Sequence, residues 1–184
     1  MNKPLHLPKT PDVETGHFYA YGYTEKLSYL DPEKVDISDK HVARGLANNC
    51  RWGGQGQRFL SVAQHSILVV LLCPDDLRKE ALLHDGHEAY LPDVPTPLKP
   101  ILGEPWKKIE ERWAREFIIH YGLDRDKLGR IKAYDMEAAE IEYEALFLGK
   151  PDRFNEVFIR YNLTAGFWSS ITAYHQFKRF MTFL

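Results

Sequence analysis

The chain has 184 residues, of which 44% are hydrophobic and 27% are charged, a composition typical of one folded globular domain and not of a disordered or fibrous protein. Its net charge of −2 provides no general attraction for a nucleic-acid backbone, which argues against nucleic acid as the main substrate. No segment approaches the roughly 20 apolar residues of a membrane helix, and no signal-peptide core is present. We therefore expect a cytoplasmic protein without a membrane partner.

The first 38 residues carry scattered prolines, glycines and aromatic residues, a pattern that disfavours a long helix. We assign residues 1–34 to an irregular arm or short hairpin that packs on the body of the domain. From Ser38 the apolar residues follow helical spacing until Asn48 and Asn49, which predicts a helix of about three turns.

The segment NNCRWGGQGQRF (48–59) holds three glycines in four positions and predicts a loop whose backbone can approach a ligand closely. Residues 59–73 are apolar nearly all round, as expected of a central buried helix, and His65 is the exception. The next helix is predicted to begin at Asp75 and Asp76 and to run to about Leu91. The two cysteines form no close metal-type pair, so we expect free buried thiols.

Residues 92–103 contain four prolines and predict an extended or turning loop. Helical spacing then predicts two long amphipathic helices, over 104–122 and 125–148, and a last helix over about 166–184. No internal repeat and no sustained strand alternation is present, so the expected fold class is all-α. We expect one domain, with its core in residues 35–148 and a C-terminal extension in 149–184.

Four chemically active side chains are crowded into HDGHE (84–88). On a helix, His84 and Glu88 are four residues apart and Asp85 and Glu88 are three apart, so they share one patch of surface. Imidazole nitrogen and carboxylate oxygen together suit a divalent transition metal. Because two adjacent residues cannot complete a coordination shell, His65 and Asp135, each on another predicted helix, are the candidates for the remaining ligands.

Each of these residues has an ordinary structural interpretation. His65 alone is more often a hydrogen-bonded core histidine, Asp135 alone a charge on a helix surface, and Glu88 a solvated side chain. The ordered set His…His-Asp-x-x-Glu…Asp on successive helices favours the metal site. A zincin metalloprotease motif is absent, because Leu91 stands where that motif needs a second histidine.

Three longer stretches carry a family resemblance: CRWGGQGQRFLSVAQHS (50–66), ALLHDGHEAYLPDVPTPLK (81–99) and IKAYD (131–135), preceded by VDISDKHVARGLANN (35–49). They resemble the HD-domain metal-dependent phosphohydrolases, and among these the small deoxynucleotide-hydrolysing branch that includes phage-type dATP triphosphohydrolases. The resemblance spans residues 35–135 and is loose outside them. It implies an all-α helical bundle with four metal ligands, namely His65, His84, Asp85 and Asp135.

The remaining roles follow the chemistry of phosphate hydrolysis together with the resemblance. Glu88 is placed to orient the attacking water without binding the metal. Asp93 matches the family's second acidic residue after the His-Asp pair. We favour a supporting role for it, as a hydrogen-bond partner of a ligand histidine or of a phosphate-binding lysine, over direct catalysis.

Three cations are candidates for binding phosphate: Arg51 in the glycine-rich loop, Lys99 at the end of the proline-rich loop, and Lys132, which faces the same way as Asp135. The alternative for each is a solvated surface cation. Trp52 is a candidate for stacking on the sugar or base and for crowding a 2′-hydroxyl, with core packing as its alternative. His87 departs from the family pattern and has no assigned role.

The leading hypothesis is a metal-dependent phosphohydrolase acting on deoxynucleotides. We favour a deoxynucleoside triphosphate triphosphohydrolase that prefers dATP over a deoxynucleoside 5′-monophosphatase, because three cations suit more than one phosphate. A phosphodiesterase and a non-catalytic nucleotide sensor are the alternatives. The ligand set accepts Zn, Co, Mn, Ni or Fe, and Mg can accompany the phosphates. We further expect a homo-oligomer, a dimer or hexamer, in the cytoplasm of a bacterium or a phage-infected host.

Overall fold

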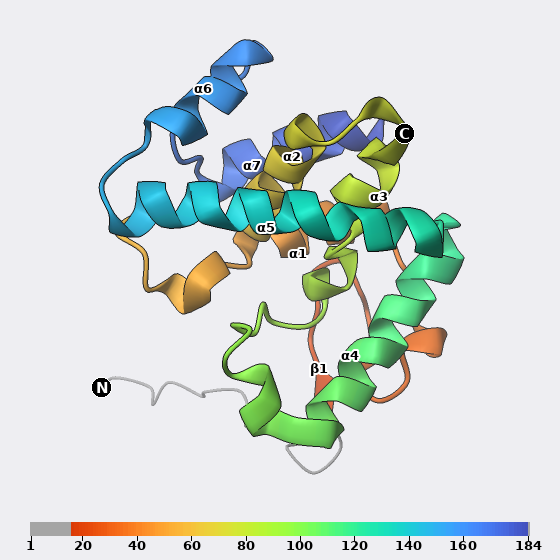
Figure 1. The fold of residues 1–184 in the computed structure, drawn as a ribbon. Helices are drawn as coiled ribbons and strands as arrows, with labels where there is room; N and C mark the ends of the chain where they lie inside the picture. The colour runs from red at the N-terminus through yellow and green to blue at the C-terminus, as the bar shows by residue number, and fades with distance from the viewer. Residues whose placement is uncertain (1–15, 184) are drawn as a thin grey trace, which may run out of the picture.

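The computed structural model describes residues 16–183, and residues 1–15 of the expected arm lie outside this range. The described part is mainly helical, as expected, with one short hairpin and four 3₁₀ turns, η1 to η4 (Figure 1). The α-helices are α1 Asp39–Asn48, α2 Val62–Leu72, α3 Arg78–Leu83, α4 Lys99–Tyr121, α5 Arg125–Phe147, α6 Asp152–Arg160 and α7 Ser170–Met181. Among residues 16–183, no helix combines the length and the hydropathy that crossing a bilayer demands.

The described part of the arm is a short hairpin. Strand β1, His17–Phe18, pairs antiparallel with β2, Leu27–Ser28, and the 3₁₀ turn η1 follows at Pro32–Lys34. Ser38 then caps α1, because its side chain accepts a hydrogen bond from the backbone N–H of His41. His41 Nδ1 lies 3.1 Å from the carbonyl oxygen of Tyr21, between the two strands, so the hairpin packs against the start of the first helix.

Helix α2 is the centre of the bundle. All residues from Val62 to Leu71 are buried, and the helix packs against α1, α3, α5, α6 and α7. Burial of each large aliphatic side chain contributes about 1.5–3 kcal/mol relative to its exposure. An imidazole on such a helix, that of His65, is therefore held in the middle of the molecule, at a position set by packing on every side.

The prediction of a single helix over residues 75–91 is wrong. The structure has a 3₁₀ turn η3 at Asp75–Leu77, then α3, which ends at Leu83, and a separate 3₁₀ turn η4 at Gly86–Ala89. Gly86 explains the break, because a Cβ there would lie 2.8 Å from the ring of Phe117. The chain bends so that its backbone can pack on this ring of α4, a tertiary contact that local spacing does not reveal.

The proline-rich loop predicted over 92–103 is shorter than expected, because α4 begins at Lys99. Pro100 lies in the first turn, where its missing N–H costs no hydrogen bond. Gly103 then interrupts the helix with φ 70° and ψ −160°, and the predicted long helix continues behind this kink. Pro100, the last proline of the predicted loop, therefore belongs to the first turn of α4.

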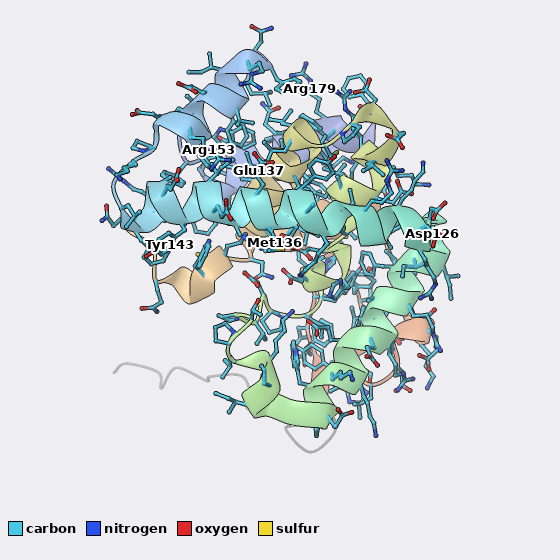
Figure 2. All side chains as sticks on the ribbon, viewed as in Figure 1. Asp126, Met136, Glu137, Tyr143, Arg153 and Arg179 are labelled. Carbon is cyan, nitrogen blue, oxygen red and sulfur yellow. The ribbon has the colours of Figure 1, made fainter. Side chains whose placement is uncertain are left out.

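Helix α5 crosses the face of the bundle (Figure 1) and is capped at its start by Asp124, whose side chain accepts from the backbone N–H groups of Asp126 and Lys127. Helix α6 was not predicted, although Phe154, Val157 and Phe158 bury one of its faces. Arg153 and Glu137, 3.0 Å apart, join it to α5 (Figure 2). The last helix, α7, is shorter than the segment predicted over 166–184 and is capped by Ser169.

Candidate metal centre

Two imidazoles and two carboxylates meet beneath the middle of α5. His65 Nε2 of α2 lies 3.3 Å from Asp135 Oδ1 of α5 and 3.6 Å from Asp85 Oδ2. His84 Nε2, at the end of α3, lies 3.1 Å from Asp85 Oδ2 and 3.9 Å from Asp135 Oδ1. The four residues expected to be ligands therefore lie close together, although His65 and Asp135 are far apart in the sequence.

The orientation of both imidazoles fits a metal ion. His65 Nδ1 donates to Glu142 Oε1 over 2.6 Å, and His84 Nδ1 donates to the carbonyl oxygen of Ala81 over 2.8 Å. Both Nε2 atoms are left facing the centre, buried and without a hydrogen-bond partner among the described residues. A buried nitrogen without a partner is costly unless it binds something. Ligand histidines commonly hold their second nitrogen in this way.

The charges around the centre favour a cation. Burial opposes the ionised form of Asp85, yet the neighbouring His84 outweighs it, so the pKa of Asp85 lies well below its usual range. Burial likewise opposes a charged His84, but Asp85 and Asp135 raise its pKa to about 10. Protons therefore supply positive charge here when no metal does. One donor atom each of His65, His84 and Asp135 lies within 4.8 Å of the others, so this group could hold a metal ion.

Glu88 reaches the site from η4 and not, as expected, from one helical turn beyond His84. It is 6% exposed, and its Oε2 has no hydrogen-bond partner in the described part of the chain. Burial, together with the charges of Asp85 and Asp93, raises the pKa of Glu88 well above its usual range. This carboxylate is therefore available to hydrogen-bond a ligand or water.

Asn49 was not among the predicted site residues, yet it joins η4 to the loop that follows. Its side-chain nitrogen donates to the carbonyl oxygen of Glu88 over 3.0 Å, and its side-chain oxygen accepts from the backbone N–H of Asp93 over 3.3 Å. Burial raises the pKa of Asp93. Two acidic residues of the candidate site are therefore held in place by one amide at the end of α1.

Arg51 and Trp52 occupy the 3₁₀ turn η2, Arg51–Gly54. The guanidinium Nη1 of Arg51 lies 3.8 Å from Asp85 Oδ2, and its Nε donates to Glu142 Oε2 over 3.0 Å. The indole Nε1–H of Trp52 donates to the same oxygen over 3.0 Å, and the ring packs edge-on against Phe147. Arg51 therefore lies next to the candidate metal centre. Trp52 has packing partners, as its alternative role in core packing requires.

The two lysines differ in how the structure places them. Lys132 is an exposed cation 4.0 Å from Asp135 Oδ2, at the rim of the centre. Lys99 donates to Glu110 Oε1 over 2.7 Å. Burial disfavours the charged form of Lys99, but Glu110 raises its pKa above the usual value. Lys99 is therefore paired with a carboxylate of α4.

A cavity of about 280 Å³ adjoins the centre on the side of α4. His84, Asp85, Lys132 and Asp135 line it together with apolar residues of α3, α4, α5 and the α4–α5 connection. His87, which had no assigned role, also lines this cavity, and burial lowers its pKa. A larger cavity of about 510 Å³ lies among α2, α3 and α7, and none of the predicted site residues lines it.

Glu142 is the buried residue that the sequence interpretation missed. It is fully buried on α5, seven residues after Asp135. Seven residues are about two helical turns, so both side chains share one face of the helix. Burial alone would raise the pKa of Glu142, but Arg51 and His65 hold it below the usual value. This spacing from Asp135 was the signal available in the sequence.

The fold and the site thus define a helical protein with a candidate metal centre built from three helices and a turn. No protein-family model matches the chain. It is 34% identical over 150 residues to the uncharacterized protein RCAP_rcc00048 of Rhodobacter capsulatus, a match that covers 69% of this chain and 76% of that protein. The chain belongs to the same family as this protein.

A second relative is the uncharacterized protein YfdR of Escherichia coli. It is 40% identical to this chain over 102 residues, which are 55% of the chain and 57% of the length of YfdR. The chain therefore spans a little over half of that relative.

Proposed function

We propose that the protein is a metal-dependent phosphohydrolase of the HD-domain type that acts on deoxynucleotides. The observation that carries the proposal is the convergence of His65 Nε2 and His84 Nε2, both buried and unpartnered among the described residues, on the carboxylates of Asp85 and Asp135. A divalent cation held there supplies a Lewis acid that polarises a phosphoryl oxygen. The donor set of nitrogen and oxygen suits Zn, Mn, Co, Ni or Fe.

Glu88 is the residue that acts on water in this proposal. Its buried carboxyl group has an unpartnered Oε2 among the described residues, and burial with the charges of Asp85 and Asp93 raises its pKa, the direction that makes a carboxylate a stronger base. Arg51, 3.8 Å from Asp85, lies where it can compensate the charge of a phosphate. Lys132 adds a second cation at the rim. Together they provide activation of water and stabilisation of the developing negative charge.

The substrate class follows from the family resemblance and from the cations. We favour a deoxynucleoside triphosphate, cleaved to deoxynucleoside and triphosphate, with dATP preferred. The structure adds a constraint, since Lys99 is paired with Glu110, so Arg51 and Lys132 are the cations nearer to the centre. Trp52 next to Arg51 is the residue proposed to crowd a 2′-hydroxyl.

The test is a substrate panel with identification of the products. Purified protein loaded with Mn²⁺ or Co²⁺ is incubated with dNTPs, NTPs, dNMPs and cyclic dinucleotides, with and without a chelator. We expect release of triphosphate from dNTPs, faster than from NTPs, and loss of activity with the chelator. Phosphate released from dNMPs alone would identify a 5′-monophosphatase, and cleavage of cyclic dinucleotides a phosphodiesterase. Absence of any hydrolysis would refute the proposal.

A further inference from the structure

We propose that Glu142 is a positioning residue that couples the metal ligand His65 to the loop of Arg51 and Trp52. The part of the inference that concerns Arg51 rests on the proposed function, whereas the part that concerns His65 needs only metal binding. Nothing in the sequence pattern of the ligands requires a carboxylate at this place on α5.

The two oxygens of Glu142 have separate partners. Oε1 accepts from Nδ1 of His65 over 2.6 Å, while Oε2 accepts from Arg51 Nε and from Trp52 Nε1, each over 3.0 Å. The donors come from α2 and from η2, and the carboxylate comes from α5. One fully buried group therefore links three segments of the chain.

The bond to His65 determines which ring nitrogen faces the centre. With Nδ1–H held by Glu142, Nε2 faces Asp135 and Asp85 and is the nitrogen available to a metal ion. Without that acceptor, the proton can move to Nε2 or the ring can rotate, and either change removes the ligand atom from the centre. Partners of this kind typically change metal affinity about 10–100-fold when they are mutated.

The bonds to the loop hold an unfavourable backbone conformation. Trp52 has φ 58°, a left-handed value that is uncommon for a residue other than glycine. Its indole bond to Glu142 and the adjacent Arg51 bond fix this turn, and with it the guanidinium that lies 3.8 Å from Asp85. Glu142 therefore sets the position of a metal ligand and of the proposed phosphate-binding arginine at the same time.

The experiment compares Glu142→Gln with Glu140→Gln, which alters an exposed glutamate of the same helix. A glutamine side chain has the same size as glutamate but only one acceptor oxygen, so its NH₂ group must face either His65 or the Arg51–Trp52 pair. Binding of Mn²⁺ to the metal-free proteins is measured by calorimetry, and kcat and KM with dATP are measured on the metal-saturated proteins. For E142Q we expect about 10–100-fold weaker Mn²⁺ binding and a raised KM, and for E140Q changes below about twofold.

Folding is checked by circular dichroism, and metal binding is measured at a temperature at which each variant is folded. A merely structural role of Glu142 would lower thermal stability and leave the Mn²⁺ affinity of the folded protein unchanged, and that result would overturn the inference. If E142Q does not fold, Glu142→Asp, which keeps the charge but is one methylene shorter, decides in the same assay, with weaker Mn²⁺ binding supporting the inference and unchanged binding overturning it. Mn²⁺ binding without hydrolysis of any nucleotide would refute the proposed function alone.

Discussion

Glu88 is the buried carboxylate whose removal tests the proposed chemistry most directly. Replacing it by glutamine keeps the volume and removes the proton acceptor, so we expect kcat to fall by about 10²–10⁴. Because Glu88 is proposed to orient water and not to bind the metal, Mn²⁺ affinity should change little. Steady-state kinetics and calorimetry on the same preparation check both expectations.

Glu140→Gln again serves as the control for the Glu88 variant, since it removes an exposed glutamate. If Glu88→Gln bound nucleotide and metal like the unmodified protein and neither turned over any substrate, a nucleotide sensor would be the better description. If the variant kept full activity, the water-orienting role would have to be abandoned.

Cys73 is a residue whose reactivity follows from burial. It ends α2, and burial raises the pKa of its thiol to about 11. At pH 8 the thiolate fraction is then roughly 100-fold smaller than for an ordinary thiol, so alkylation of the native protein by iodoacetamide should be slow by a similar factor. Because the folded state holds this proton more tightly, the stability linked to Cys73 is fully present below about pH 8.5 and is lost as the pH rises toward 11.

Mass spectrometry after a timed exposure to iodoacetamide measures the modification of Cys73, with the urea-unfolded protein as the reference. Equal rates in the folded and unfolded states would show that the thiol is not protected. Free buried thiols were expected from the sequence, and both cysteines, which lie within residues 16–183, are free in the structure, but Cys73 alone is buried whereas Cys50 is half-buried.

At the scale of residues, the sequence is most informative where a motif fixes the chemical type and the spacing together. The pattern singled out His65, His84, Asp85 and Asp135, these residues lie close together in the structure, and donor atoms of His65, His84 and Asp135 could hold a metal ion. Glu142 was not found, although its spacing of seven residues from Asp135 places both on one face of α5, because a glutamate on an amphipathic helix is usually solvated. Its role depends on three donors that are distant in the sequence.

At the scale of elements, caps and apolar spacing predicted α1, α2 and α5 closely, since their signals are local. The break between α3 and η4 depends instead on Gly86 against the ring of Phe117, and no local pattern contains that contact. Helix α6 had a readable signal in Phe154, Val157 and Phe158, at helical spacing, and was overlooked.

The break between α3 and η4 predicts opposite changes in the free energy of unfolding for two glycine-to-alanine substitutions. In Gly86→Ala the new Cβ would lie 2.8 Å from Phe117, so we expect the free energy of unfolding to fall by about 1–3 kcal/mol. In Gly129→Ala, on α5, no heavy atom lies within 4 Å of the new Cβ, and helix propensity should add up to about 1 kcal/mol of stability. Urea unfolding followed by circular dichroism compares the two with the unmodified protein. Equal stability of the two variants would mean that Gly86 does not determine the break.

At the scale of the whole molecule, the candidate centre joins helices that are far apart in the sequence. His65 lies on the central helix, His84 and Asp85 follow α3, and Asp135 lies in the middle of α5. The sequence predicted the mainly helical fold and singled out the residues that meet at the candidate centre, but not how the chain turns between them. That arrangement is set by the burial of α2 on all sides.

Because the ligands come from separate helices, metal binding should stabilise the entire fold and not a single loop. A cation that binds only the folded state adds about 2.7 kcal/mol at a concentration of 100 times its Kd. For a chain of about 150–250 residues, each kcal/mol shifts Tm by about 2–4 °C, so Mn²⁺ should raise Tm by about 5–11 °C. Asp135→Asn removes one donor carboxylate and should abolish most of this shift, whereas the exposed Glu140→Gln should retain it. Thermal unfolding with Mn²⁺ and with a chelator measures the difference. A Tm that is independent of Mn²⁺ in the unmodified protein would show that these helices converge without binding the ion, and their buried imidazoles would then need another partner.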